Sequence, residues 1–291
     1  MVFAFPSPAV GNGAEENGKL HPISSRVLSG WDQSKEGEVE GRSSAWSVKA
    51  LVIATTLAAT LVSPAADAAV TALAPHSTVA GKSIGEWSAA WWQWAFSRGP
   101  VDNPFTDGTQ AAADNGQAGP VYFLAGTAGG TATRSFNVPA DKYLLVPLIN
   151  AECSDLEGNG TTDQKLRDCA NGLIGPVDGL TANGIVFSGS AFDYRESSPG
   201  TFSFTAVPGN ALFVAPGTAS MAVADGYYMM LAPVGPGPQT IEYGGMVSGG
   251  KVPPVFETLV TLNLNGVPEP GALILAAAGL LGLAATRRRR A

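Results

Sequence analysis

A pair of closely spaced carboxyl groups is the first feature of this sequence suited to chemistry. Asp193 and Glu196 lie three residues apart. Two neighbouring carboxyl groups act as acid and base, or as acid and nucleophile, in the hydrolysis of a glycosidic bond. The other interpretation is a solvated turn leading into Ser197-Ser198-Pro199-Gly200. A secreted polysaccharide hydrolase is therefore the alternative function for this chain.

A second acidic stretch resembles the first half of a calcium-binding loop. Its oxygen-bearing side chains fall at positions 1, 3, 5 and 9 of such a loop, at Asp155, Glu157, Asn159 and Asp163. Gly160 occupies position 6, but Leu166 stands at position 12, where a bidentate glutamate is expected. Calcium is one interpretation, and a glycine-broken polar turn is the other. We expect no other cofactor.

The sequence contains only two histidines that could act as a general base or a metal ligand. His21 lies near the start, and His76 lies in a segment that we expect to be a flexible terminus. The motif H-E-x-x-H and a phosphate-binding glycine loop do not occur. These observations favour a non-catalytic protein.

A tryptophan-rich segment predicts a helix over residues 84–97. Ser83 and Glu86 form a capping box, and Gly99-Pro100 ends the helix. A single face carries Ile84, Trp87, Trp91 and Trp94. That spacing is typical of a buried core stripe.

Trp92 lies off this stripe, beside Phe96, and is therefore our candidate for an exposed ring. An exposed indole stacks on sugar rings or lies at a membrane interface. The alternative for the whole helix is burial against a sheet.

Short apolar or alternating runs, punctuated by Gly, Pro, Asn and Asp, follow this helix. We predict strands at 121–124, 135–138, 143–149, 185–187, 202–205, 212–214, 227–231 and 256–264. This pattern predicts a mainly β fold, a β-sandwich or jelly roll, with the aromatic helix at its start. A short second helix is expected between the cysteines, with Thr161 to Gln164 as its capping box and Asn171-Gly172 near its end.

The two cysteines, Cys153 and Cys169, are expected to form one disulfide, since both lie in the exported part. This part, residues 69–266, holds 8 Lys or Arg against 16 Asp or Glu, so its net charge is near −8. Such an acidic body repels phosphate backbones, which argues against nucleic-acid binding.

The N-terminal region is predicted to be an export signal behind a leader. Residues 1–45 are polar and glycine-rich and are expected to be disordered. In residues 46–68, Lys49, an apolar run and Ala66-Asp67-Ala68 describe a peptide that signal peptidase removes. The leader is an unusual extension of that signal, or the translation start has been placed too early.

The C-terminal segment, residues 267–291, has three parts in a fixed order. Val267, Pro268, Glu269 and Pro270 come first, and the prolines keep this stretch extended. Fifteen uncharged residues follow and are expected to form a hydrophobic helix that enters the bilayer. The last part, a cytoplasmic stop of four arginines, consists of Arg287, Arg288, Arg289 and Arg290.

These three parts resemble the PEP-CTERM sorting signal. The resemblance implies a Gram-negative host, transient anchoring in the inner membrane and cleavage by an exosortase-like membrane enzyme. It also implies release to the cell surface or to an extracellular exopolysaccharide matrix, as found in biofilms.

Three phrases of the body, at 86–95, 119–126 and 146–150, resemble a family of uncharacterised secreted bacterial proteins. That resemblance implies one secreted domain and no particular activity. The sequence as a whole predicts an exported structural or carbohydrate-binding component of exopolysaccharide.

Overall fold

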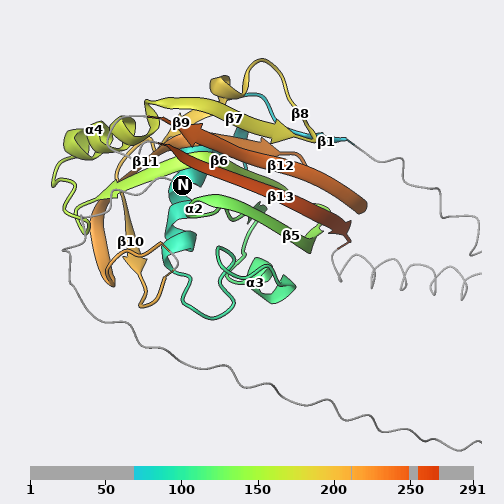
Figure 1. The fold of residues 1–291 in the computed structure, drawn as a ribbon, viewed down its shortest axis with the longest axis horizontal. Helices are drawn as coiled ribbons and strands as arrows, with labels where there is room; N and C mark the ends of the chain where they lie inside the picture. Colours follow the sequence, from blue (N-terminus) through green and yellow to red (C-terminus); the bar gives the residue numbers. More distant parts are fainter. Residues whose placement is uncertain (1–68, 211, 249–254, 269–291) are drawn as a thin grey trace, which may run out of the picture. The chain divides into compact units, whose positions relative to one another are not determined.

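The computed structural model describes residues 69–210, 212–248 and 255–268 (Figure 1). The expected leader, signal peptide and C-terminal apolar helix lie outside these residues, as do Glu269, Pro270 and the arginines at 287–290. Within the described part, no helix combines the length and apolar character needed to cross a membrane.

The body is mainly β, as the sequence predicts, with two larger sheets that share one core. The first sheet contains β4 (Val121–Phe123), β6 (Tyr143–Ser154), β9 (Arg195–Ser197), β10 (Phe202–Ala206) and β11 (Gly217–Leu231). The second contains β5 (Gly130–Pro139), β7 (Val177–Asn183), β12 (Gly237–Val247) and β13 (Phe256–Val267). The two-stranded sheets pair β1 (Val70–Thr71) with β8 (Ile185–Val186), and β2 (Thr78–Val79) with β3 (Lys82–Ser83).

Each larger sheet is mixed, because it contains both parallel and antiparallel strand pairs. In the first sheet the order is β10-β11-β6-β4, with β9 also paired to β11, and β4 runs parallel to β6. In the second sheet the order is β5-β13-β12-β7, and β5 runs parallel to β13. Because a jelly roll is antiparallel, a sandwich describes this fold better.

Alternation along the strands places the core between the two sheets. On β13, Val260, Leu262 and Leu264 are buried in the same cluster as Leu144 and Met229 of the first sheet. Asn263 and Asn265 of β13 point the other way and are exposed. The predicted period of two along this strand is confirmed.

Six strands were missed and one predicted strand is wrong. The long strands β7 and β12 and the short strands β1, β2, β3 and β9 were not predicted, and residues 212–214 lie in a turn. The side chain of Asn210 organises this turn, because its Oδ1 accepts from the N–H groups of Leu212 and Val214. A local side-chain contact of this kind competes with strand pairing.

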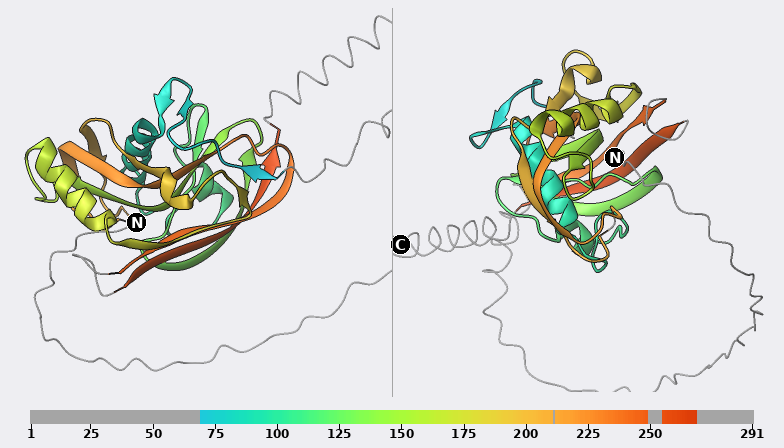
Figure 2. Two further views of the ribbon diagram at one scale, coloured as in Figure 1. Left: turned by 90° about the horizontal axis from the view of Figure 1, so that it is seen from above. Right: turned by 90° about the vertical axis from the view of Figure 1, so that its left-hand side faces the viewer.

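Helix α2 (Ile84–Phe96) covers the face of the first sheet that is turned away from the second (Figure 2). Both hydrogen bonds of the predicted capping box between Ser83 and Glu86 are present. The indole N–H groups of Trp87, Trp91 and Trp94 donate to the backbone oxygens of Val79, Leu124 and Asn115. The helix is therefore fixed by directed hydrogen bonds as well as by apolar burial.

Helix α4 (Asp163–Ile174) packs against β6 and β11 at one end of the core. Its N-cap is Thr162 rather than Thr161, and it continues past Gly172 to a C-cap at Gly175. The Cys153–Cys169 disulfide is present and links β6 to this helix, with 6.1 Å between the Cα atoms.

A glutamine bonds the backbone of one residue on an edge strand of each larger sheet. Gln110 begins α3 (Gln110–Asp114), and its amide bonds both the N–H and the carbonyl oxygen of Asn137 on edge strand β5. Gln117 bonds the same two groups of Phe123 on edge strand β4. Each amide satisfies backbone groups that would otherwise be free to pair with another strand.

We expect Trp92→Ala to lower the free energy of unfolding by about 3–5 kcal/mol, as does Trp91→Ala, because truncating a buried ring leaves a cavity. Both rings are fully buried. Gln93→Ala, on the exposed side of α2, is the control and should cost less than about 1 kcal/mol. Urea unfolding followed by far-ultraviolet circular dichroism measures all three. Equal stability of Trp92→Ala and Gln93→Ala would contradict this prediction.

Candidate functional site

The expected exposure of Trp92 is wrong. Its side chain is 0% exposed, and its indole N–H donates to the hydroxyl of Tyr228 at 3.2 Å. Its ring stacks on Phe96, which in turn stacks on Phe204 of β10. β10 therefore covers the part of the helix that lies off the main stripe, and a sugar cannot reach this ring.

The two candidate catalytic carboxylates have separate contacts. Asp193 accepts from the backbone N–H of Ser190 at 2.7 Å and caps the short 3-10 helix Ala191–Tyr194. Glu196, on β9, accepts from the backbone N–H of His76 at 3.1 Å, and its Oε1 lies 3.0 Å from the Nδ1 of that histidine. His76 is thus held by Glu196 rather than in a free terminus.

The candidate calcium ligands make other contacts within the protein, and Glu157 accepts from the hydroxyl of Ser154 at 2.8 Å. Asp155 accepts from the N–H groups of Ser220 and Met221 on β11, and Asn159 accepts from the N–H of Ser154. Asp163 pairs with Arg167 one turn further along α4. Among the described residues, no three His, Cys, Asp or Glu side chains are grouped to hold a metal ion. Calcium binding here stays a prediction, and these contacts argue against it.

Sequence reasoning missed a buried carboxyl group at Glu152, which follows Asn150 and Ala151 on β6. The side chain is 6% exposed, and its Oε1 has no hydrogen-bond partner among the described residues. Burial, followed by the neighbouring carboxyl of Glu157, raises the pKa of Glu152 well above its ordinary value. Nothing in the local sequence marks this position as buried, because its burial depends on how the chain folds around it.

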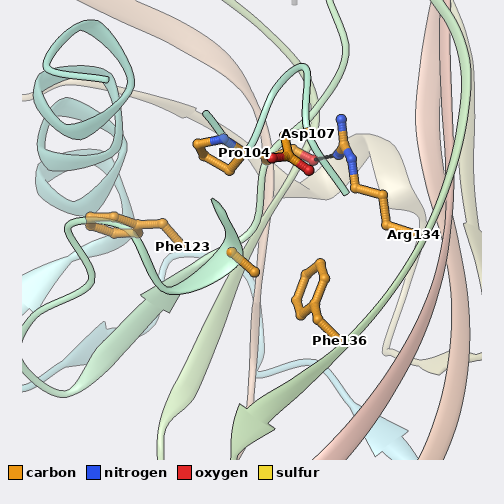
Figure 3. A pocket seen from close by; sticks show the side chains of 7 residues that line it. Pro104, Asp107, Phe123, Arg134 and Phe136 are labelled. Carbon is orange, nitrogen blue, oxygen red and sulfur yellow. Dashed lines mark hydrogen bonds between the residues drawn. The ribbon is translucent and has the colours of Figure 1, made fainter. Parts of the chain in front are cut away.

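A buried arginine lies beside a small cavity between the sheets and α3 (Figure 3). The guanidinium of Arg134 donates to the carbonyl oxygens of Ala125, Gly126 and Phe105, at 2.7, 3.1 and 3.2 Å. The cavity, about 10 Å³ in volume, has room for one water molecule at most. This site holds loops together and is too small for a ligand.

A ladder of uncharged polar side chains covers the outer face of the second sheet. The register aligns Ser135 of β5 with Asn263 of β13, and Asn137 with Asn265. Asn265 donates to Asn137 at 3.0 Å, and Asn263 donates to Ser135 at 3.3 Å. Thr240 of β12 donates to the Oδ1 of Asn263 at 2.9 Å. We call these five residues the amide ladder.

The amide ladder lines a hollow of about 510 Å³. The other lining residues are Gln110, Phe136, Pro238, Gln239 and Leu264. The lining therefore contains amides, hydroxyls and apolar groups, and none of its residues carries a charge. Such a surface can bind a ligand by hydrogen bonding.

The sorting segment begins at the end of an inner strand. β13 ends at Val267, whose carbonyl oxygen accepts from the N–H of Ala140 at 2.9 Å, and Pro268 is exposed. Up to this point β13 is paired on both sides, with β5 and β12. A cut beyond Pro268 therefore removes no strand of the core.

A PEP-CTERM protein-sorting motif matches residues 266–290. The chain is thus an exported protein whose precursor passes the membrane and is processed by an exosortase-type membrane enzyme. No curated protein and no solved structure matches the chain. The resemblance of the body to uncharacterised secreted proteins stays a prediction.

We expect Glu152→Gln to raise the free energy of unfolding at pH 7 by on the order of 1 kcal/mol, because the amide cannot ionise and so removes the cost of burying a carboxyl group that the unfolded chain would ionise at this pH. Since the folded-state pKa is raised, the folded protein binds more protons than the unfolded chain above about pH 4.3. Stability therefore falls as the pH rises through this range, and Glu152→Gln should weaken that dependence.

Urea unfolding of the wild type and Glu152→Gln from pH 4 to pH 8 measures the effect. Glu257→Gln, which changes an exposed glutamate on β13, is the control and should leave the pH profile unchanged. Parallel profiles for Glu152→Gln and the wild type would show that Glu152 is not responsible.

Proposed function

We propose that the released body is a structural or carbohydrate-binding component of the cell surface or of an exopolysaccharide matrix. The observation that carries this proposal is the position of the sorting motif, residues 266–290, which begins at the last two residues of β13. Because Pro268, Glu269 and Pro270 follow this strand, a cut there can release the folded body whole. The released protein then presents the amide ladder, which is suited to binding and not to bond cleavage.

The contacts of the candidate catalytic residues support a non-catalytic function. Asp193 caps a short helix, and Glu196 is bonded to His76. Neither residue lines the hollow beside the amide ladder. The alternative, a polysaccharide hydrolase that uses these two carboxylates, predicts new reducing ends when the protein is incubated with the host's exopolysaccharide. On this alternative, Glu196→Gln would abolish the formation of new reducing ends without reducing binding to the polysaccharide.

We expect the mature protein to begin near Ala69 and to end close to Pro270, because the A-x-A site and the Pro-Glu-Pro stretch mark these boundaries. Intact-mass measurement of the protein from the medium of its host tests both ends. Replacing Pro268, Glu269 and Pro270 with alanine should keep the arginine tail on the protein and reduce release. A wild-type product that still carries Arg287 to Arg290 would contradict the expected processing.

Co-fractionation with washed matrix tests the destination. The released protein should be retained by matrix and should leave it only when the polysaccharide is removed enzymatically. Recovery of all the protein in the soluble medium, with none in the matrix, would contradict the proposed function.

A further inference from the structure

We propose that the amide ladder and the hollow beside it form a binding site for an uncharged polysaccharide. This inference rests on the proposed matrix function and gives it a site and a ligand class. Its basis is the chemistry of the hollow, where seven of the ten lining residues carry an amide or a hydroxyl and none carries a charge.

The lining groups match the hydrogen-bonding character of sugar hydroxyls. A sugar hydroxyl both donates and accepts, and so does a side-chain amide. Asn265 uses one amide N–H on Asn137, which leaves its second N–H and its oxygen available. Asn137 accepts through its oxygen, which leaves both of its amide N–H groups available. Both side chains are exposed, so a ligand can reach these groups.

Contacts within the ladder hold its side chains in place before a ligand arrives. Thr240 bonds Asn263, and Asn263 bonds Ser135, so that three strands are joined in one row. At the edge of the sheet, Gln110 is held by the backbone of Asn137 on both sides of its amide. Side chains already fixed lose less conformational entropy on binding, which favours affinity.

Charge distinguishes an uncharged polymer from an acidic one. Asp114, which bonds the lining residue Gln110, also accepts from Tyr122, and Glu242 of β12 accepts from Thr261 and Asn183. No Lys or Arg lines the hollow to pair with a uronate or a sulfate. The body also carries a net charge near −8, which repels an anionic chain.

The test uses Asn137→Ala and Asn263→Ala, singly and together. Asn183→Ala is the matched control, because Asn183 is an exposed asparagine of the same sheet, on β7, that does not line the hollow. Asn263→Thr is added in case alanine weakens β13, because threonine is favoured in strands. Thermal melts of all variants establish that the proteins remain folded.

The probes are the neutral and acidic fractions of the host's exopolysaccharide, separated by ion exchange, together with alginate as a defined anionic polymer. Binding is measured by affinity electrophoresis. The released protein and the full chain in a zwitterionic detergent are tested in parallel, so that a failure of release does not stop the binding experiment.

We expect the wild type to bind the neutral fraction. Each ladder variant should bind about tenfold more weakly, as the loss of one or two hydrogen bonds implies, and Asn183→Ala should stay within about twofold. Binding carried by the acidic fraction or by alginate would overturn the inference, as would neutral binding that the ladder variants leave unchanged. In either case the matrix function survives.

Loss of self-association in the ladder variants, with sugar binding unchanged, would identify a second copy of the chain as the occupant and also overturn the inference. Failure of the wild type to bind any fraction would remove the carbohydrate-binding function together with the site. A released protein with no affinity for whole matrix would remove the proposed function itself.

Discussion

The fold depends on how the tryptophan helix is held against the first sheet. At the centre of this contact, the hydroxyl of Tyr228 accepts from the indole of Trp92 and from the side-chain amide of Asn150. All three residues are at most 1% exposed, so each polar atom must find its partner within the protein. Burial raises the pKa of Tyr228, which keeps the hydroxyl protonated. A helix shifted along the sheet would leave these groups unpaired, which fixes its position.

Because α2 docks on the first sheet, the two sheets differ in which of their faces are covered. The first sheet is covered on both faces, by α2 on one side and by the shared core on the other. The second sheet has only its inner face in the core, and its outer face carries the exposed residues Ser135, Asn137, Asn263 and Asn265. Surface for a ligand is therefore available on the sheet that does not carry the aromatic helix.

Local sequence patterns predicted several of the helices and strands, whereas the amide ladder depends on pairing between strands that are far apart in the sequence. The alternation along 256–264 and the capping box at Ser83 involve neighbours in sequence, so both were visible. Trp92 was misplaced because helical periodicity shows one buried face, whereas Phe204 of β10 covers a second one. The amide ladder joins residues near 137, 240 and 263, and only the strand order reveals that they meet. Glu152 was missed because its burial depends on the fold rather than on its neighbours in sequence.

The edge glutamines connect protection of the fold with the proposed binding site. β5 is an edge strand, and its uncharged outer face would suit pairing with another chain. The side-chain amide of Gln110 bonds the backbone N–H and carbonyl oxygen of Asn137 at this edge, and Gln110 also lines the hollow. The contact that blocks pairing of another strand at Asn137 therefore also fixes one wall of the site. The proposed matrix function requires both properties, because an open strand edge favours aggregation over binding to a polymer.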